Sequence, residues 1–187
     1  TYSSGSNTVN PIVTSTYAVI GSNPAGCVSA SPAIITVTVN ALPVLTISGS
    51  NTICSGTSAT LTAGGANTYT WGAVTGSVLV ISPTVATTYS LGGTDLNGCS
   101  SLTTMIISVN PSPTISASVA TICPNNSFTI VPSGAVSYTY SGGSNIVTPS
   151  VTSTYSIVGT NSFGCQSLSQ AVVTVVVVNQ IKVTISG

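Results

Sequence analysis

Charge is almost absent from this chain. Of its 187 residues only Asp95 and Lys182 carry a charged side chain, and there is no His, Arg or Glu. Catalysis generally depends on titratable groups such as His, paired carboxylates or an activated Lys or Cys. Metal sites mostly use His, Asp, Glu or thiolate ligands, and nucleic-acid binding needs a basic surface. The composition therefore predicts no catalytic residue, no cofactor, no metal site and no nucleic-acid partner.

The chain also lacks a long apolar run. The longest, residues 171–178, is interrupted by Thr174, and a membrane-spanning helix needs about 20 residues. We therefore expect a buried strand there and no transmembrane segment. No signal peptide is visible after Thr1, so we expect a mature chain or a part of a longer one.

Hydroxyl side chains supply most of the polarity instead, with 32 Ser and 30 Thr. The hydrophobic fraction of 42% argues against disorder, which goes with low hydrophobicity and high net charge. A net charge near zero is unfavourable for solubility. We therefore expect a protein that is packed into a fibre, covered by glycans on its Ser and Thr hydroxyls, or both.

The chain repeats itself at intervals of about 70 residues. Thr1–Cys27 aligns without gaps on Thr139–Cys165, an offset of 138 positions. Three times, a tyrosine precedes the cysteine of a Gly-Cys pair by ten residues, and these pairs end at Cys27, Cys99 and Cys165. Such a fixed period is typical of tandem copies of one structural module.

The repeat boundaries follow from three asparagines that each close an apolar strand, Asn40, Asn110 and Asn179. They divide the chain into 1–40, the back half of one module, two whole modules, 41–110 and 111–180, and 181–187, the first strand of a following module or a strand donated to a neighbouring chain. We call the first three segments the first, second and third repeats. Their short joints, which contain proline, predict limited hinge motion.

Strand-favouring residues alternate with turn signals within the second repeat. The expected strands are Val44–Ser48, Ser58–Ala63, Thr68–Trp71, Ser77–Ile81, Thr87–Gly92 and Leu102–Val109. No segment has helical periodicity. Six or seven short strands in about 70 residues predict an all-β fold of tandem, small immunoglobulin-like β-sandwiches. Because so small a module has a thin core, we expect one disulfide in each.

The cysteines of the whole modules recur at two positions. Cys54 and Cys123 precede the second expected strand, and Cys99 and Cys165 follow the fifth. We predict the disulfides Cys54–Cys99 and Cys123–Cys165, each of which would stabilise its module by roughly 4 kcal/mol. Cys27 is then unpaired within this chain or paired outside it.

Other uses of the cysteines have less support. A zinc site favours clustered thiolates such as C-x2-C, and no two cysteines here are so close. A catalytic thiol would have no His to activate it. A bond from Cys27 to another subunit stays open. Disulfides persist in oxidising compartments, so we expect an extracellular or cell-surface location.

The second repeat carries four characteristic strings: Thr-Ile-Cys-Ser-Gly-Thr-Ser-Ala-Thr-Leu-Thr-Ala (52–63), Asn-Thr-Tyr-Thr-Trp (67–71), Ser-Pro-Thr-Val-Ala-Thr-Thr-Tyr (82–89) and Gly-Thr-Asp-Leu-Asn-Gly-Cys (93–99). This series resembles the immunoglobulin-like repeats of extracellular, adhesin-like surface proteins of Bacteroidota, which are often exported by the type IX system. The resemblance covers the whole chain. In the third repeat Tyr140 replaces the Trp, and Cys-Pro-Asn-Asn (123–126) replaces Cys-Ser-Gly. The resemblance implies an extracellular, repetitive, non-catalytic role.

Several single residues invite a functional interpretation. Asp95 fits an Asx-type turn better than a calcium site, which needs several oxygen ligands. We expect Trp71 to pack in the core rather than to stack on a sugar. For Tyr17, Tyr89 and Tyr155 we expect a buried ring whose hydroxyl bonds to the backbone.

These features together predict a non-catalytic structural protein, a stiff segment of an extracellular filament, fibril or surface stalk. Its partners would be copies of itself, joined by strand pairing between chains, or further repeats of the same chain. The alternatives are an adhesin that binds carbohydrate or another surface, and a spacer region of a larger secreted enzyme.

Overall fold

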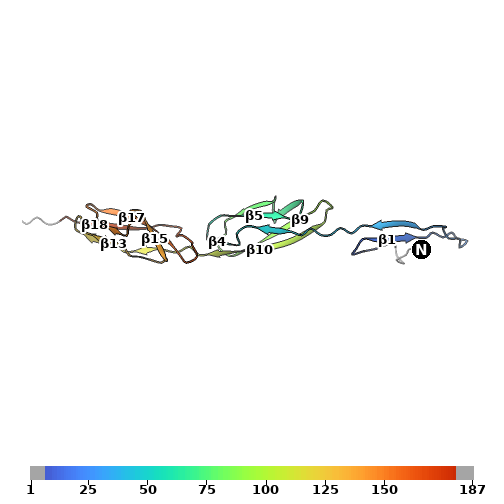
Figure 1. The fold of residues 1–187 in the computed structure, drawn as a ribbon, viewed down its shortest axis with the longest axis horizontal. Helices are drawn as coiled ribbons and strands as arrows, with labels where there is room; N and C mark the ends of the chain where they lie inside the picture. The colour runs from blue at the N-terminus through green and yellow to red at the C-terminus, as the bar shows by residue number, and fades with distance from the viewer. Residues whose placement is uncertain (1–6, 180–187) are drawn as a thin grey trace, which may run out of the picture. The chain divides into compact units, whose positions relative to one another are not determined.

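The computed structural model describes residues 7–179, and every regular element in this range is a strand (Figure 1), which confirms the all-β prediction. Backbone contacts divide the chain into two compact units. One comprises Thr1–Gly49, Leu61–Leu79 and Tyr89–Met105, and the other comprises Ser50–Thr60, Val80–Thr88 and Ile106–Gly187. The second repeat contributes to both units. The repeat boundaries remain predictions, and the strand expected at 181–187 lies outside the described residues.

The third repeat is a small β-sandwich. Its larger sheet has the order β12 (Ala120–Ile122), β18 (Ala171–Val177), β17 (Ser153–Thr160) and β15 (Ser137–Tyr140). Two strand pairs make the other layer: β11 (Ser116–Ala117) with β14 (Pro132–Ser133), and β13 (Phe128–Thr129) with β16 (Ile146–Val147). β12 runs parallel to β18, and the other pairs are antiparallel. The larger sheet combines strands from the beginning, middle and end of the repeat, and the other layer combines strands from its beginning and middle. Two packed sheets of this kind form an immunoglobulin-like sandwich.

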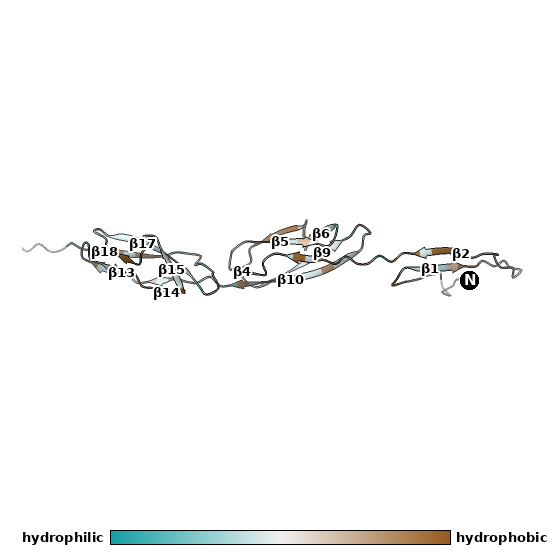
Figure 2. Cartoon of the chain, in the orientation of Figure 1, coloured by the Kyte–Doolittle hydropathy of each residue, from teal (hydrophilic) through white to brown (hydrophobic). Residues whose placement is uncertain are grey.

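The core of the third repeat lies between these layers. Ile157, Val173 and Val175 from the larger sheet pack with Ile130 and Val147 from the other layer. β18 consists almost entirely of Val and appears brown in Figure 2. Its β-branched residues suit a strand whose alternate side chains are buried.

The second repeat has the same strand order. One sheet is β4 (Thr52–Cys54), β10 (Ser100–Asn110), β9 (Thr87–Thr94), β6 (Thr68–Trp71) and β7 (Val74–Thr75). The other sheet is β3 (Thr46–Ser48), β5 (Ala59–Gly64) and β8 (Val78–Ile81). All six expected strands are confirmed within a few residues at each end. The sequence did not predict β4 or β7.

The first repeat is described as a two-stranded hairpin of β1 (Ser15–Val19) and β2 (Ala33–Val37) (Figure 1). Tyr17 lies opposite Ile35 in this antiparallel pair. Ile34 and Ile35 remain 69% and 60% exposed, because within residues 7–179 this hairpin has no second sheet against which to pack.

The aromatic residues bear out one expectation and correct another. Trp71 is 6% exposed and its Nε1 donates to the carbonyl oxygen of Gly76 at 3.1 Å, which confirms core packing. The hydroxyls of the tyrosines at 17, 89 and 155 have no hydrogen-bond partner among the described residues. The expected hydroxyl-to-backbone bonds are made instead by Tyr69, to Ala66, and by Tyr138, to Ala135. These two tyrosines begin a strand just after a tight turn, which brings backbone groups within reach of their hydroxyls.

Candidate functional site: a disulfide joint

The Gly-Cys pair of the third repeat sits in a tight turn between β17 and β18. Asn161 N donates to the Cys165 carbonyl at 3.0 Å, and Gly164 N donates to the Asn161 carbonyl at 3.1 Å. The side-chain Oδ1 of Asn161 accepts from the N–H groups of Phe163 and Cys165, both at 3.0 Å. This Asx turn fixes the direction of Cys165.

The same turn recurs in the other two repeats. Asp95 Oδ1 accepts from the N–H groups of Asn97 and Cys99 at 2.8 and 2.9 Å. Asn23 Oδ1 likewise accepts from Cys27 N at 2.9 Å. The expected Asx turn at Asp95 is thereby confirmed. An Asn or Asp four residues before each Gly-Cys cysteine was visible in the sequence, and it is the signal that marks all three turns.

The other cysteine of the second repeat ends a strand. β4 runs parallel to the last residues of β10, with Cys54 opposite Asn110. Ser55 N donates to the Asn110 carbonyl at 2.9 Å, and Thr57 N donates to the Cys54 carbonyl at 3.1 Å. This turn holds Cys54 beside the point at which the chain leaves β10.

A disulfide joins Cys54 to Cys165, which are 111 residues apart in sequence and 5.5 Å apart between Cα atoms. The main chain passes the same place at Asn110–Pro111, where the Nδ2 of Asn161 donates to the Pro111 carbonyl at 2.8 Å. Two covalent connections therefore run side by side. We call this arrangement, the Asn110–Pro111 peptide with the Cys54–Cys165 disulfide, the joint.

One side of the disulfide is buried, and one apolar side chain passes near the other. Cys165 is fully buried. A Cβ added to Gly56 would lie 3.9 Å from Leu168 Cδ2, so the Leu168 side chain passes close to the turn that follows Cys54.

The joint corrects the predicted Cys54–Cys99 pairing. Cys99 directly precedes the first residue of β10, whereas Cys54 lies opposite its last. A strand of eleven residues is about 35 Å long, while the Cα atoms of a disulfide lie within about 7 Å of each other. The two cysteines therefore mark opposite ends of β10 and cannot be joined.

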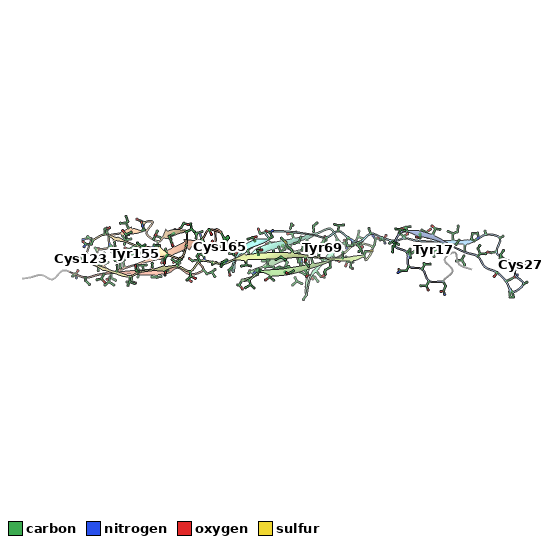
Figure 3. All side chains as sticks on the ribbon, turned by 90° about the horizontal axis from the view of Figure 1, so that it is seen from below. Tyr17, Cys27, Tyr69, Cys123, Tyr155 and Cys165 are labelled. Atoms are coloured by element: carbon green, nitrogen blue, oxygen red, sulfur yellow. A yellow bond between two sulfur atoms is a disulfide. The ribbon has the colours of Figure 1, made fainter. Side chains whose placement is uncertain are left out.

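The predicted Cys123–Cys165 pairing is wrong for the same reason. Cys123 follows β12, whose last residue, Ile122, pairs with Val177 at the end of β18. Cys165 lies in the turn that follows Thr160, at the other end of β17. Figure 3 shows the two cysteines at opposite ends of the third repeat. The expectation of one disulfide inside each module is corrected accordingly.

Cys27, Cys99 and Cys123 form no disulfide with any described residue. Cys27 is exposed, and the other two are half-buried. Across residues 7–179 no group of three or more His, Cys, Asp or Glu side chains could hold a metal ion. Within the same range no helix is long and apolar enough to cross a membrane. The chemistry of the described cysteines is that of thiols and disulfides.

No family model and no curated protein matches the chain. Among solved structures, it is similar to a Ca2+-stabilized adhesin with which an Antarctic bacterium binds ice, at 11% identity and a TM-score of 0.40, over 89% of this chain and 57% of the adhesin. It is also similar to the Bacteroides ovatus mixed-linkage glucan utilization locus protein SGBP-B, in complex with a mixed-linkage heptasaccharide, at 16% identity and a TM-score of 0.23, over 91% of this chain and 54% of that one. A third is protocadherin gamma B2, extracellular cadherin domains 3–6, at 13% identity and a TM-score of 0.23, over 89% and 57%. The chain thus spans little more than half the length of these structures, and at such similarity they assign it no family.

Proposed function

We propose that the chain is a non-catalytic structural protein, a segment of an extracellular stalk or filament built from immunoglobulin-like repeats. The observation that carries the proposal is the joint, where the Cys54–Cys165 disulfide crosses beside Asn110–Pro111. A single peptide connection lets neighbouring domains pivot. A second covalent link close to the first restrains both bending and twisting, which is what a stalk requires.

Non-covalent contacts at the joint act in the same direction. The Asn161–Pro111 hydrogen bond ties the Asx turn of the third repeat to the chain that leaves β10. Leu168 also passes close to Gly56, in the turn that follows Cys54. Each contact contributes little alone, about 1 kcal/mol for a hydrogen bond, but together they oppose rotation about the disulfide.

The surface suits close packing of copies. Asp95 is the only charged side chain among residues 7–179. Outward positions of the strands carry hydroxyls, as at Thr60 and Thr62 of β5, which are exposed on either side of the buried Leu61. Such a surface has almost no charge repulsion. Copies of the chain or further repeats are therefore the proposed partners, with glycans on Ser and Thr as a second proposed coating.

The proposal includes an extracellular or cell-surface location, because disulfides persist in oxidising compartments. We further propose that the chain belongs to the surface proteins of Bacteroidota that the type IX system exports. This part of the proposal rests on the sequence resemblance, which is strongest in the second repeat.

Small-angle X-ray scattering of the oxidised protein tests the mechanical role. We expect the double variant Cys54→Ser/Cys165→Ser to sample a broader range of maximum dimensions than the native chain. The matched control, Thr60→Ser/Thr62→Ser, changes two exposed hydroxyl side chains of β5 away from the joint and should leave the scattering unchanged. Equal flexibility in all three proteins would refute a stiffening role.

Electron microscopy separates the two forms of the proposal. Fibrils in purified native protein, lost when inter-chain strand pairing is blocked by dilution, support the filament. Dispersed single particles at every concentration exclude the filament and leave the stalk segment.

A further inference from the structure

We propose that the cysteines left free form disulfides across joints of the same kind: Cys99 with the strand-end cysteine of the preceding repeat, and Cys123 with the Gly-Cys turn of the following one. Every repeat would then be covalently linked to both of its neighbours. The inference rests on the proposed structural role, and it extends that role from one observed joint to a continuous series.

Cys99 matches Cys165 in position and local geometry. Each is the last residue of an Asx turn in which Oδ1 of an Asp or Asn four residues earlier accepts the cysteine N–H, at 2.9 and 3.0 Å respectively. The N–H of that same Asp or Asn donates back to the cysteine carbonyl in both turns, at 2.9 and 3.0 Å. The turn therefore holds the backbone of Cys99 in the same way as it holds that of Cys165.

Cys123 matches Cys54 in the same way. Cys54 ends, and Cys123 directly follows, a short strand that runs parallel to the last strand of its repeat. Gly56 N donates to the Pro83 carbonyl at 3.4 Å, and Asn125 N donates to the Pro149 carbonyl at 3.1 Å. These two residues share a left-handed backbone, with φ of 74° at Gly56 and 62° at Asn125, and Asn tolerates that conformation better than most residues.

The exposure of the free turn cysteines indicates that they lack a partner that would cover them. Cys165, which has its partner, is fully buried, whereas Cys99 is half-buried and Cys27 exposed. These positions would be covered by the strand-end cysteine turn of a preceding repeat.

No alternative partner exists inside the repeat. The strand lengths place Cys99 and Cys54 at opposite ends of β10, and Cys123 and Cys165 at opposite ends of the third repeat. No cysteine among the 187 residues occupies the two partner positions. The proposed partners are therefore cysteines that are not among residues 1–187, in the same polypeptide or in a second copy. By the same rule Cys27 pairs with the repeat that precedes its own.

Each bond is an oxidation. Two thiols lose two protons and two electrons, an Sγ–Sγ bond forms, and a thiol–disulfide oxidoreductase of the oxidising compartment is reduced from its disulfide to its dithiol. The turn cysteines are held by backbone hydrogen bonds before the reaction, so the geometry of the product is largely set in advance.

The test is disulfide mapping of the complete native polypeptide, purified from its source under thiol-blocking conditions and digested without reduction. We expect Cys99 to be linked to a peptide in which the cysteine ends a Thr-Ile-Cys-like strand, and Cys123 to a peptide in which it follows Gly. Links within one polypeptide or between two copies, distinguished by isotope-mixed samples, both support the inference. Free, alkylated Cys99 and Cys123, a Cys99–Cys123 bond, or bonds within one repeat would each overturn it.

The outcome is independent of the scattering test. If the bonds are found but the joint does not stiffen the chain, the covalent series stands and the mechanical role fails. If the joint stiffens the chain but Cys99 and Cys123 are free thiols, the mechanical role stands and the series fails.

Discussion

The Nδ2 atom of Asn161 donates a hydrogen bond to the carbonyl oxygen of Pro111, at 2.8 Å. The same side chain accepts two N–H groups through Oδ1, so one amide both builds the Gly-Cys turn and fastens it to the chain leaving β10. In the second repeat the equivalent residue is Asp95, which builds the turn but has no N–H with which to make the second contact.

Asn161→Asp is therefore expected to keep the turn and lose the contact. The carboxylate accepts the Phe163 and Cys165 N–H groups as Asp95 does for its own turn, but it places an oxygen against the Pro111 carbonyl. We expect the free energy of unfolding to fall by about 1–2 kcal/mol, measured by urea denaturation. Asp95→Asn is the control and should change it by less than about 0.5 kcal/mol. Equal effects of the two substitutions would show that the Pro111 contact contributes nothing.

Loss of the disulfide should cost more. Cys54→Ser removes a bond that closes a loop of 111 residues. In the chain-entropy model, closing such a loop stabilises the folded state by about 5 kcal/mol. We expect a lower midpoint of thermal unfolding, and no further decrease on adding a reductant. The double variant Cys54→Ser/Cys165→Ser provides the control, because it lacks the same bond and should unfold at the same midpoint as Cys54→Ser. A reductant that lowered the midpoint of Cys54→Ser as much as that of the native chain would contradict the assigned pairing.

Tyr138 should stabilise the turn before β15 through its hydroxyl. The hydroxyl accepts from Ala135 N at 3.0 Å and donates to the Ala135 carbonyl at 2.9 Å. Tyr138→Phe leaves both backbone groups without this partner, so we expect the free energy of unfolding to fall by about 1–2 kcal/mol. Tyr140→Phe, whose hydroxyl has no partner among residues 7–179, is the control. A similar effect of both substitutions would assign the loss to ring packing rather than to the hydrogen bonds.

The sequence was sufficient for the features that depend on local pattern. Alternation and turn residues located six strands of the second repeat, Asp95 with Asn97 nearby indicated the Asx turn, and the usual place of aromatic residues in such sandwiches put Trp71 in the core. Each of these depends on neighbours within a few residues along the chain.

The disulfide pairing could not be found in this way. Spacing gives the length of a closed loop, whereas pairing depends on the register of strands far apart in the chain. Of the two strands missed, the one that decides the pairing is β4, only three residues long. Its parallel alignment with β10 places Cys54 at the far end from Cys99. Without β4, both cysteines appear to flank the same small core.

A substitution at Gly159 of β17 tests whether close packing between the two layers of the third repeat excludes a larger side chain. A Cβ at this buried position of β17 would overlap Ile115 Cδ1 and lie 2.7 Å from Ala135 Cβ. We therefore expect Gly159→Ala to lower the free energy of unfolding by about 1–3 kcal/mol, the usual range for overpacking. Gly142→Ala is the control, since its Cβ would meet only the Tyr155 ring, at 3.8 Å.

A second substitution identifies the atom responsible. Ile115→Val removes Cδ1, the atom nearest to the added methyl, so Gly159→Ala should cost less in the Ile115→Val background than in the native chain. Denaturation of the four proteins of this double-mutant cycle gives the coupling directly. Strictly additive effects would mean that the contact with Ala135 or the strand backbone, rather than the contact with Ile115, requires glycine. The equivalent Gly93, whose added Cβ would overlap Leu45 and lie 3.0 Å from Ala66 Cβ, should then show the same additivity, because the two repeats share this packing.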